Sequence, residues 1–249
     1  MSGALQGRIA LVTGASRGIG EAIAHALAQA GADVAVGYRE REAAAAEVVG
    51  RIDGLGRRAL AVQADVTVRA QVRAMVSRTV ETLGTVDILV NNAGLLQQKP
   101  FADITDEDWD RVLAVNLKGV FLCSQEVLPA MLRQGSGRIV NMASSGGQLG
   151  GPLAPHYSAG KAGVISLTRS LARLAAPDVA VNCIAPGPID TEMAGAEMAS
   201  EAGAQKLRQI PLGRLGAAEE VAASVVFLAA SAPYVTGHTI NVNGGLYFG

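Results

Sequence analysis

Short apolar segments alternate with longer segments of helical periodicity along the whole chain. The short segments, such as Ile-Ala-Leu-Val at 9–12 and Ile-Leu-Val at 88–90, do not alternate apolar with polar residues. Strands of a parallel sheet have this pattern because helices cover both faces of the sheet. The longer segments place apolar residues four positions apart, as at Ile23 and Leu27, on one helix face. The repeated strand and helix order therefore predicts a doubly wound α/β fold.

No linker or change of composition divides the chain, so we expect one domain over residues 1–249. The pattern predicts strands over 8–13, 33–38, 58–63, 86–91, 137–143, 179–184 and 238–242. It predicts helices over 18–30, 40–53, 68–83, 106–134, 155–175 and 217–230. The helix from 106 to 134 is expected to be continuous and to begin at a capping pattern, Thr105-x-x-Asp108. The segment at about 188–214 has no regular periodicity, and such segments are usually lids or binding loops.

Charge and composition exclude several classes of protein. Twenty-one basic and 22 acidic residues give a net charge of −1 without long runs of one sign, whereas a nucleic-acid-binding protein normally has a basic face. We find no run of about 18 apolar residues and no signal peptide, so no membrane span is predicted and the cytoplasm is the expected location. Cys123 and Cys183 lie far apart without a CxxC spacing, and the three histidines show no ligand spacing. We therefore expect two buried free thiols and no metal site.

A glycine-rich turn joins the first predicted strand to the first predicted helix. Glycine makes up 30 of the 249 residues, and this turn reads Thr13-Gly-Ala-Ser-Arg-Gly-Ile-Gly20. Such a turn is either only structural or lets the backbone approach a pyrophosphate at a helix N-terminus. Its position at the first strand-to-helix turn favours a nucleotide site. The candidate cofactor-binding residues here are Gly14, Ser16, Arg17, Gly18, Ile19 and Gly20.

The end of the second predicted strand bears on the choice of dinucleotide. An acidic residue about 20 positions after the glycine turn normally binds the ribose 2′-hydroxyl. This chain has Tyr38 there, followed by Arg39. An arginine at this place, together with Arg17, suits a 2′-phosphate and therefore NADP(H), with NAD(H) as the alternative. Arg39 could instead simply open the solvated run at 39–42.

Candidate catalytic groups lie at the ends of later strands. Tyr157 and Lys161 are four residues apart, so they share one helix face. A free tyrosine has a pKa of about 10, and an adjacent ammonium favours the phenolate. Ser144 precedes Tyr157 by 13 residues, and Asn91-Asn-Ala-Gly94 follows the fourth predicted strand. A Tyr-x-x-x-Lys pair alone arises by chance on many helices.

Taken together, these motifs resemble the short-chain dehydrogenase/reductase family. The resemblance extends from Arg8 to Gly245, and among members of the family it is greatest to the 3-oxoacyl-[acyl-carrier-protein] reductases, with sugar and alcohol dehydrogenases close behind. It implies a Rossmann-type parallel sheet of about seven strands with helices on both faces. It also implies an oxidoreductase that transfers hydride between NADP(H) and a ketone or secondary alcohol.

The resemblance assigns roles to individual residues. Tyr157 would be the general acid in ketone reduction and the base in alcohol oxidation. Lys161 would lower the pKa of Tyr157 and bind the nicotinamide ribose. Ser144 would bind the substrate oxygen, and Asn116 would hold a water molecule on a proton path. The implied cofactor contacts beyond the glycine turn are Asp65 and Val66 at the adenine, Asn92, Ala93 and Gly94 with Asn91 behind the ribose, and Pro186, Gly187, Ile189 and Thr191 near the carboxamide.

The resemblance also implies partners. The substrate would be a small carbonyl or alcohol compound or an acyl thioester, and the chain would form a homotetramer through helices 106–134 and 155–175. Gly135 and Asp178 stand in two turns where reductases of carrier-protein substrates commonly have basic residues, which weakens a carrier-protein partner. Asn243 replaces the more usual aspartate, with little expected effect.

Two other functions remain open from the sequence. One is a catabolic dehydrogenase of a secondary alcohol or sugar; the other is a non-catalytic nucleotide sensor, which the intact Ser144, Tyr157 and Lys161 argue against. His156 could contact substrate or face solvent. The large apolar residues expected in the core or at an interface are Trp109, Phe121, Met131 and Phe227.

Overall fold

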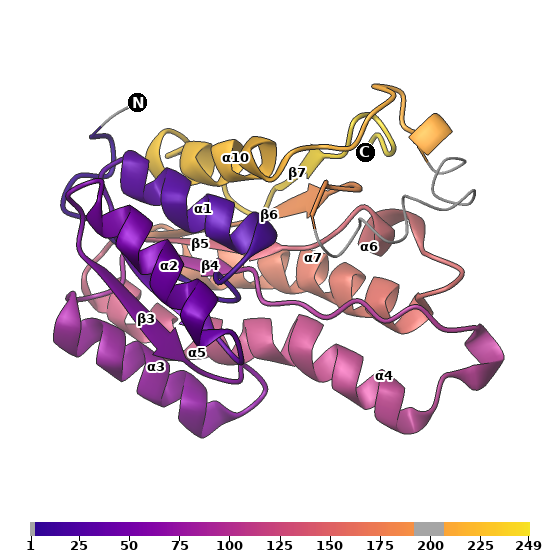
Figure 1. The fold of residues 1–249 in the computed structure, drawn as a ribbon, viewed down its shortest axis with the longest axis horizontal. Coiled ribbons are helices and arrows are strands. Elements are labelled where there is room, and N and C mark those ends of the chain that lie inside the picture. The colour runs from indigo at the N-terminus through magenta and orange to yellow at the C-terminus, as the bar shows by residue number, and fades with distance from the viewer. Residues whose placement is uncertain (1–2, 192–206) are drawn as a thin grey trace.

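Seven parallel strands form a single sheet in the order β3-β2-β1-β4-β5-β6-β7 (Figure 1). The computed structural model describes residues 3–191 and 207–249. The order and direction of the strands confirm the predicted doubly wound α/β fold. The strands are β1 (Ile9–Val12), β2 (Asp33–Tyr38), β3 (Ala59–Gln63), β4 (Ile88–Asn91), β5 (Gly137–Met142), β6 (Val179–Pro186) and β7 (Thr239–Val242).

The helices lie between successive strands and agree closely with the periodicity of the sequence. Every strand, and every predicted helix except the one over 106–134, begins and ends within two residues of its predicted bounds. The helices are α1 (Gly18–Gln29), α2 (Glu42–Asp53), α3 (Arg69–Thr82), α4 (Asp106–Leu113), α5 (Gly119–Arg133), α6 (Gly146–Leu149), α7 (Pro155–Ala175) and α10 (Ala218–Ala230). A short 3-10 turn, η1 (Phe101–Asp103), and α6 were not predicted. The structure describes residues 188–191 and 207–214 of the expected irregular segment, and these contain no strand or long helix. Residues 192–206 lie outside the described residues.

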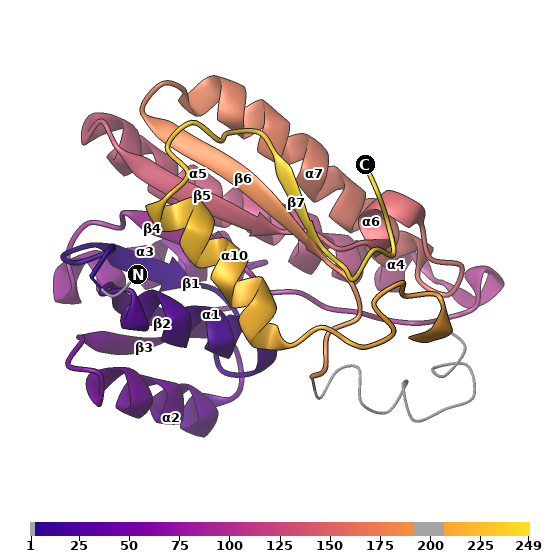
Figure 2. The same cartoon turned by 90° about the horizontal axis from the view of Figure 1, so that it is seen from above.

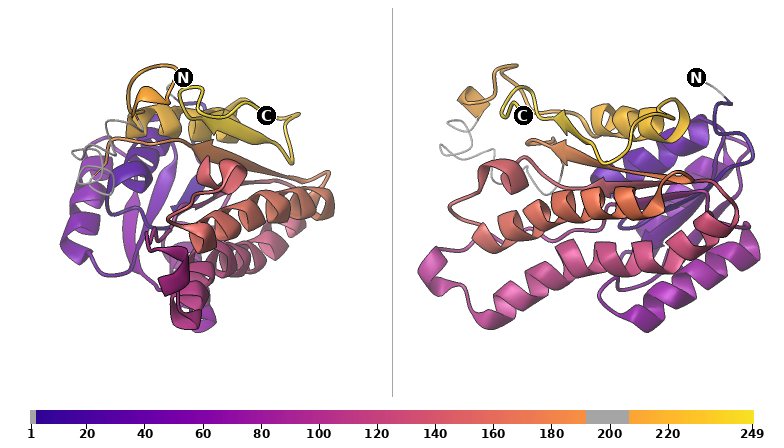
Figure 3. Two further views of the ribbon diagram at one scale, coloured as in Figure 1. Left: turned by 90° about the vertical axis from the view of Figure 1, so that its right-hand side faces the viewer. Right: turned by 180° about the vertical axis from the view of Figure 1, so that it is seen from behind.

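Helices cover both faces of the sheet, which explains why the strands are apolar throughout. Helices α1, α2 and α10 lie on one face, where Leu27 and Val225 are fully buried (Figure 2). Helices α3, α5 and α7 cover the other face, where Met75 and Met131 are buried (Figure 3). Cys123 and Cys183 are buried free thiols, as predicted.

The predicted continuous helix from 106 to 134 is wrong in one respect. It contains a π-helical segment, η2 (Ala114–Lys118), between α4 and α5. The side-chain amide of Asn116 donates to the carbonyl of Val112, 3.0 Å away, and so takes an acceptor that regular α-helical backbone would use. A polar side chain that bonds a carbonyl of the preceding turn interrupts the regular series of backbone hydrogen bonds. The interrupted turn contains Asn116, a predicted catalytic residue.

Residues 106–133 are also long and apolar enough to cross a membrane by length and composition. Half of their most apolar window is buried inside the fold, where α4 and α5 contact α7 and α3. Core helices of α/β proteins meet the same criterion, so this property indicates burial against the sheet.

Strand β1 lies between β2 and β4, and the chain moves to opposite sides of β1 to form these two neighbours. The loops that leave β1 and β4 therefore diverge at the carboxyl edge of the sheet. Ligands of open α/β sheets bind in the crevice that this divergence creates. The glycine turn after β1 and the Asn91–Gly94 segment after β4 both lie there.

Candidate active site

The glycine turn passes so close to the loop after β4 that side chains have no room. Gly14 has a positive φ of +64°, and a Cβ on it would lie 2.9 Å from the Cα of Ala93. A Cβ on Gly20 would lie 2.3 Å from the carbonyl oxygen of Gly14. Helix α1 begins here without a side-chain cap on its N-terminus, which leaves backbone N–H groups available for an anion. The predicted residues of this turn thus form a backbone cradle of the kind that holds a pyrophosphate.

Hydrogen bonds between Thr13 and Asn92 join the two loops. The Asn92 side-chain amide donates to the carbonyls of Thr13 and Gly14, both at 3.0 Å. The Thr13 hydroxyl accepts from the backbone N–H groups of Asn92 and Ala93, at 3.0 and 3.1 Å. Asn92 was predicted as a cofactor contact, and the structure shows that its amide braces the glycine turn.

The residues expected near the adenosine ribose lie at the end of β2. Tyr38 is buried, and burial, with a smaller contribution from Glu42, raises the pKa of its phenol. Arg39 is more than half exposed and forms an ion pair with Glu40. Because exposed pairs contribute at most about 1 kcal/mol, Arg39 can exchange this partner for a phosphate at little cost.

Asp65 and Val66, the predicted adenine pair, follow β3. The Asp65 carboxylate accepts from the backbone N–H and the hydroxyl of Thr67, at 2.8 and 2.7 Å, and so shapes this turn. Val66 is buried against α5, where a Cβ on Gly119 would lie 2.8 Å from its Cγ2. The structure therefore places Val66 as an apolar wall and Asp65 as the residue that positions it.

Lys161 is a buried cation on α7. It is 4% exposed, and its ammonium donates to the carbonyl of Met142 at 2.7 Å. Burial lowers the pKa of Lys161 to about 8, an effect that Cys183 partly offsets. The ammonium lies 5.8 Å from the centre of the Tyr157 ring. This pair therefore shares one helix face, as the spacing predicted.

The side chains of Tyr157 and Ser144 lie next to each other: a Cβ on Gly146 would lie 3.4 Å from Oγ of Ser144 and 3.7 Å from Cε1 of the Tyr157 ring. Burial raises the pKa of the Tyr157 phenol, and the Ser144 hydroxyl acts in the opposite direction. The Ser144 hydroxyl also accepts from the backbone N–H of Gly146 at 3.0 Å, so its own proton is free to point toward Tyr157. Lys161 was expected to lower the pKa of Tyr157, but it does not contribute to the shift. Burial is the largest cause of the shift, and the Lys161 ammonium donates to a backbone carbonyl instead.

Asn116 is fully buried in η2, next to the predicted catalytic residue Lys161. Its amide donates to the carbonyl of Leu95 at 2.7 Å, and its side-chain oxygen accepts from the backbone N–H of Leu95 at 3.2 Å. A Cβ on Gly94 would lie 3.1 Å from this oxygen and 3.5 Å from the Lys161 ammonium nitrogen. Asn116 is thus close to Lys161, and it holds the loop after β4.

The predicted carboxamide contacts lie at the last residue of β6 and directly after it. They are Pro186, Gly187, Ile189 and Thr191. A Cβ on Gly187 would lie 2.8 Å from the Cα of Asn243, so this turn packs tightly on the loop after β7. A Cβ on Gly18 would lie 3.5 Å from the Thr191 methyl group, which brings this segment back to the glycine turn. The motifs after β1, β4, β5 and β6 therefore meet at one edge of the sheet.

The structure adds three residues that the sequence analysis did not select for the site: Gln97, Lys99 and Asp108. The Thr105-x-x-Asp108 pattern does form the predicted capping box, but only the fold shows that Asp108 also bonds Gln97. His156 is fully buried, so the solvent-facing alternative is wrong.

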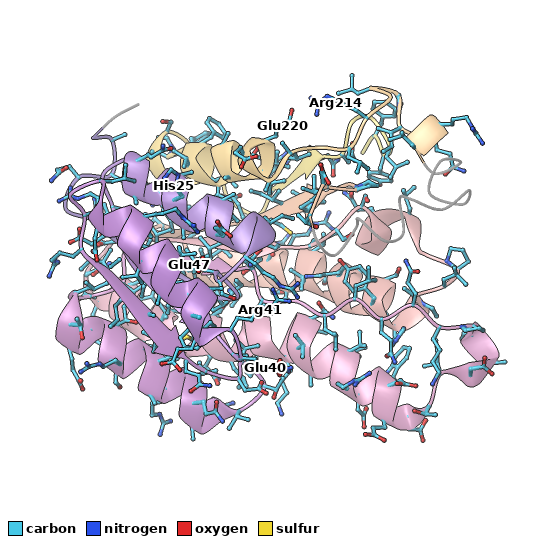
Figure 4. All side chains as sticks on the ribbon, in the orientation of Figure 1. His25, Glu40, Arg41, Glu47, Arg214 and Glu220 are labelled. Atoms are coloured by element: carbon cyan, nitrogen blue, oxygen red, sulfur yellow. The ribbon has the colours of Figure 1, made fainter. Side chains whose placement is uncertain are left out.

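A cavity of about 510 Å³ opens near the carboxyl ends of β6 and β7. It is lined partly by Pro188, Pro211 and Asn241 and by the ion pair of Arg214 with Glu220, which Figure 4 labels. None of Ser144, Tyr157 or Lys161 lines it. The chemical groups of the site therefore lie outside this cavity. Within residues 3–191 and 207–249, no cluster of three potential metal ligands occurs.

Comparisons with known proteins agree with this geometry. Residues 8–202 match the model of the short chain dehydrogenase family. The 3-oxoacyl-[acyl-carrier-protein] reductase FabG of Staphylococcus aureus is 47% identical over 240 residues, which cover 96% of this chain and 97% of that protein. A solved structure of a blue fluorescent protein from a metagenomic library, in complex with NADPH, superposes with a TM-score of 0.93 at 36% identity, over 98% of this chain and all of that one.

A second solved structure comes from Agrobacterium tumefaciens and is provisionally assigned as a gluconate dehydrogenase. It superposes with a TM-score of 0.94 at 36% identity, over 99% of this chain and 98% of that one.

The parallel sheet, the glycine cradle and the Ser144–Tyr157–Lys161 cluster define a dinucleotide-dependent oxidoreductase. The chain belongs to the short-chain dehydrogenase family, and it is an NAD(P)-dependent oxidoreductase.

Replacing Gly20 by alanine should distort the cradle. The added methyl would collide with the Gly14 carbonyl and with the Asn92 amide nitrogen, 2.4 Å away. We expect Gly20→Ala to weaken cofactor binding at least about tenfold, measured by fluorescence titration, and to lower the melting temperature. Gly50→Ala is the matched control, because nothing lies within 4 Å of that Cβ in the exposed helix α2. Equal cofactor affinity in the two variants would contradict the assignment of the cradle.

Proposed function

We propose that the chain is an NADPH-dependent ketone reductase, with 3-oxoacyl thioesters as the first substrate class to test. The observation that carries this proposal is the half-buried Tyr157 phenol, next to Ser144 and beside the buried ammonium of Lys161. The nicotinamide cofactor supplies the hydride when bound. The protein then has to position a carbonyl carbon and to deliver one proton to its oxygen.

Tyr157 would deliver that proton. Burial raises the pKa of its phenol, so the group stays protonated at neutral pH and can act as a general acid in the direction of reduction. Ser144 would donate a hydrogen bond to the same substrate oxygen and keep it near the phenol. Oxidation of an alcohol would need the phenolate, which the Lys161 ammonium would have to stabilise.

Lys161 and Asn116 would return a proton to Tyr157 after turnover. Since the pKa of Lys161 is about 8, its ammonium can exchange a proton near neutral pH. Asn116 and this ammonium both lie next to Gly94, and Asn116 would hold a water molecule there. Lys161 would also bind the nicotinamide ribose.

The preference for NADPH is inferred from two arginines. Arg17 in the glycine turn and Arg39 after β2 would bind the 2′-phosphate, and Tyr38 stands where NAD-binding sites normally have an acidic residue. The relative solved in complex with NADPH shares this fold at 36% identity. NAD(H) remains the alternative cofactor.

A second function is dehydrogenation of a sugar or secondary alcohol. The similarity to the structure assigned as a gluconate dehydrogenase favours it. Gly135 and Asp178 also stand at two turn positions where a basic residue would attract an acidic carrier protein. A small thioester or ketone therefore fits this chain better than a carrier-bound substrate.

We infer that the chain forms a homotetramer in the cytoplasm. Trp109 on α4, Phe121 on α5 and Phe227 on α10 are each about 40% exposed, while Met131 is fully buried. Large apolar side chains exposed on helix surfaces are typical of subunit interfaces. The helices α4, α5 and α7 would form one interface, and α10 with β7 another.

Tyr157→Phe removes only the phenolic hydroxyl group. We expect turnover to fall by at least about three orders of magnitude while NADPH still binds, because the ring keeps its packing. The loss is measured as NADPH oxidation, and binding as quenching of intrinsic fluorescence. Tyr234→Phe, at a fully exposed tyrosine, is the control and should match the wild type. Substantial turnover by Tyr157→Phe would overturn the mechanism.

Arg39→Ala should raise the Michaelis constant for NADPH about tenfold and leave that for NADH almost unchanged. The reason is that only the 2′-phosphate gains a charge-assisted hydrogen bond from the guanidinium. Initial rates with each cofactor at saturating ketone give both constants. Arg78→Ala, an exposed arginine on α3, controls for the change in net charge. Equal increases for the two cofactors would refute the NADPH preference.

A panel of substrates distinguishes the proposed functions. We expect the highest kcat/KM for NADPH-dependent reduction of 3-oxoacyl thioesters, ahead of simple ketones. Oxidation of polyols and secondary alcohols with both oxidised cofactors tests the alternative. Faster oxidation of gluconate or another polyol would assign the chain to the sugar dehydrogenases instead. Cofactor binding with no turnover on any compound would support the nucleotide sensor.

A further inference from the structure

A buried histidine lies next to the catalytic tyrosine, and the proposed mechanism does not use it. His156 is in the first turn of α7, directly before Tyr157, and its side chain has no solvent exposure. Its Nε2 atom lies 3.1 Å from Oε1 of Gln97, which belongs to the loop after β4. A polar ring without access to water needs such a partner, because an unpaired buried group is costly.

The hydrogen bonds continue beyond Gln97 to a carboxylate. The Gln97 amide nitrogen donates to Oδ1 of Asp108 at 2.6 Å, and Lys99 donates to its Oδ2 at 2.5 Å. Asp108 also accepts from the backbone N–H of Thr105 and thereby caps α4. The hydrogen bonds from Lys99 and Gln97, with that from Thr105, hold the pKa of this carboxyl well below its usual range, so it remains a charged acceptor.

The charge on Asp108 determines the direction of the whole chain of hydrogen bonds. A carboxylate can only accept, so Gln97 must turn its NH₂ group toward Asp108 and its oxygen toward His156. His156 must then donate from Nε2. Burial is the largest effect on the imidazole, and it lowers the pKa. The negative charge of Asp108 raises this pKa, and the positive charges of Arg111 and Lys99 lower it further. His156 is therefore a neutral ring with its proton on Nε2.

The loop that Gln97 belongs to borders the catalytic groups. It begins at Gly94, next to the Lys161 ammonium, and Leu95 is held by two hydrogen bonds to Asn116. It ends where the backbone N–H of Lys99 donates to the carbonyl of Leu153, just before α7, at 2.7 Å. Figure 1 shows this loop running between α7 and α4. The hydrogen bond between His156 and Gln97 joins the middle of this loop to the turn that carries Tyr157.

We propose that His156 and Gln97 are a positioning pair for catalysis. With Asp108 as the anchor, their hydrogen bond fixes the distance between the first turn of α7 and the loop after β4. This distance determines how a substrate carbonyl is placed against Tyr157. This inference rests on the proposed role of Tyr157. The loop after β4 is held to the glycine turn at Asn92 by hydrogen bonds that do not involve the pair, so we expect the pair to act on turnover and to leave cofactor binding nearly unchanged. Displacements of about 1 Å from distant changes can cost up to about a hundredfold in rate.

Three variants test the pair on the best substrate of the panel. His156→Leu removes the donor, Gln97→Leu removes the acceptor, and His156→Gln keeps a donor NH at similar reach. We expect each leucine variant to lower kcat about tenfold, with the Michaelis constant and the dissociation constant of NADPH within about twofold of the wild type. We expect His156→Gln to recover kcat to within about threefold. The double leucine variant should be no slower than the slower single variant, because both remove one interaction.

His25→Leu is the matched control, since His25 lies on α1, away from the site (Figure 4). It should leave kcat unchanged. The proposal is overturned if kcat of folded His156→Leu stays within twofold of the wild type, if His156→Gln is as slow as His156→Leu, or if the two leucine losses multiply. If His156→Leu does not fold, Gln97→Leu carries the same expectation. An active Tyr157→Phe refutes the proposed function itself, whereas an inactive Tyr157→Phe with an unaffected His156→Leu refutes only the positioning role.

Discussion

The hydrogen bonds between Thr13 and Asn92 hold together the two loops on which the site depends. They join the loop after β1 to the loop after β4. Between these two strands the order of strands in the sheet reverses. At their start the two loops are in backbone contact, and the Thr13 N–H also donates to the Val90 carbonyl at 3.0 Å; beyond this contact they diverge, and ligands of open α/β sheets bind in such a crevice. Glycine at 14 and 20 lets the backbones approach closely enough for these bonds. The cradle, the end of β4 and the Lys161 ammonium next to Gly94 are therefore parts of one structure.

Burial decides which protonation states of Tyr157 and Lys161 are favoured. The same low-dielectric surroundings raise the pKa of Tyr157 and lower that of Lys161 to about 8. Each shift favours the neutral form, because burial penalises charge. A protonated phenol suits a group that donates a proton to a developing alkoxide. The sequence suggested the opposite direction for Tyr157, since spacing alone shows the neighbouring cation and not the burial or the carbonyl of Met142 that the cation binds.

Much of the fold could be predicted because periodicity reports burial directly. The strands are continuous apolar runs and lie within two residues of their predicted bounds, and α7 has the bounds that were predicted for it. The π-helical segment at 114–118 escaped prediction, since it arises where a side chain, Asn116, bonds the preceding turn. Asn92 was selected as a cofactor contact for its motif, yet its amide is used within the protein. The assignments of Tyr157 and of the other site residues to chemical roles stay predictions.

The sequence by itself determined the class of fold, the order of its elements and the motif residues that gather at one edge, because local pattern and spacing follow from chemistry close along the chain. Only the tertiary structure decided that His156 is buried and that Gln97 and Asp108 join it to α4. These residues are 59 and 48 positions from His156, and no local pattern records which distant side chains will share a hydrogen bond. Such contacts depend on how helices and loops pack across the sheet, and packing is a property of the whole chain.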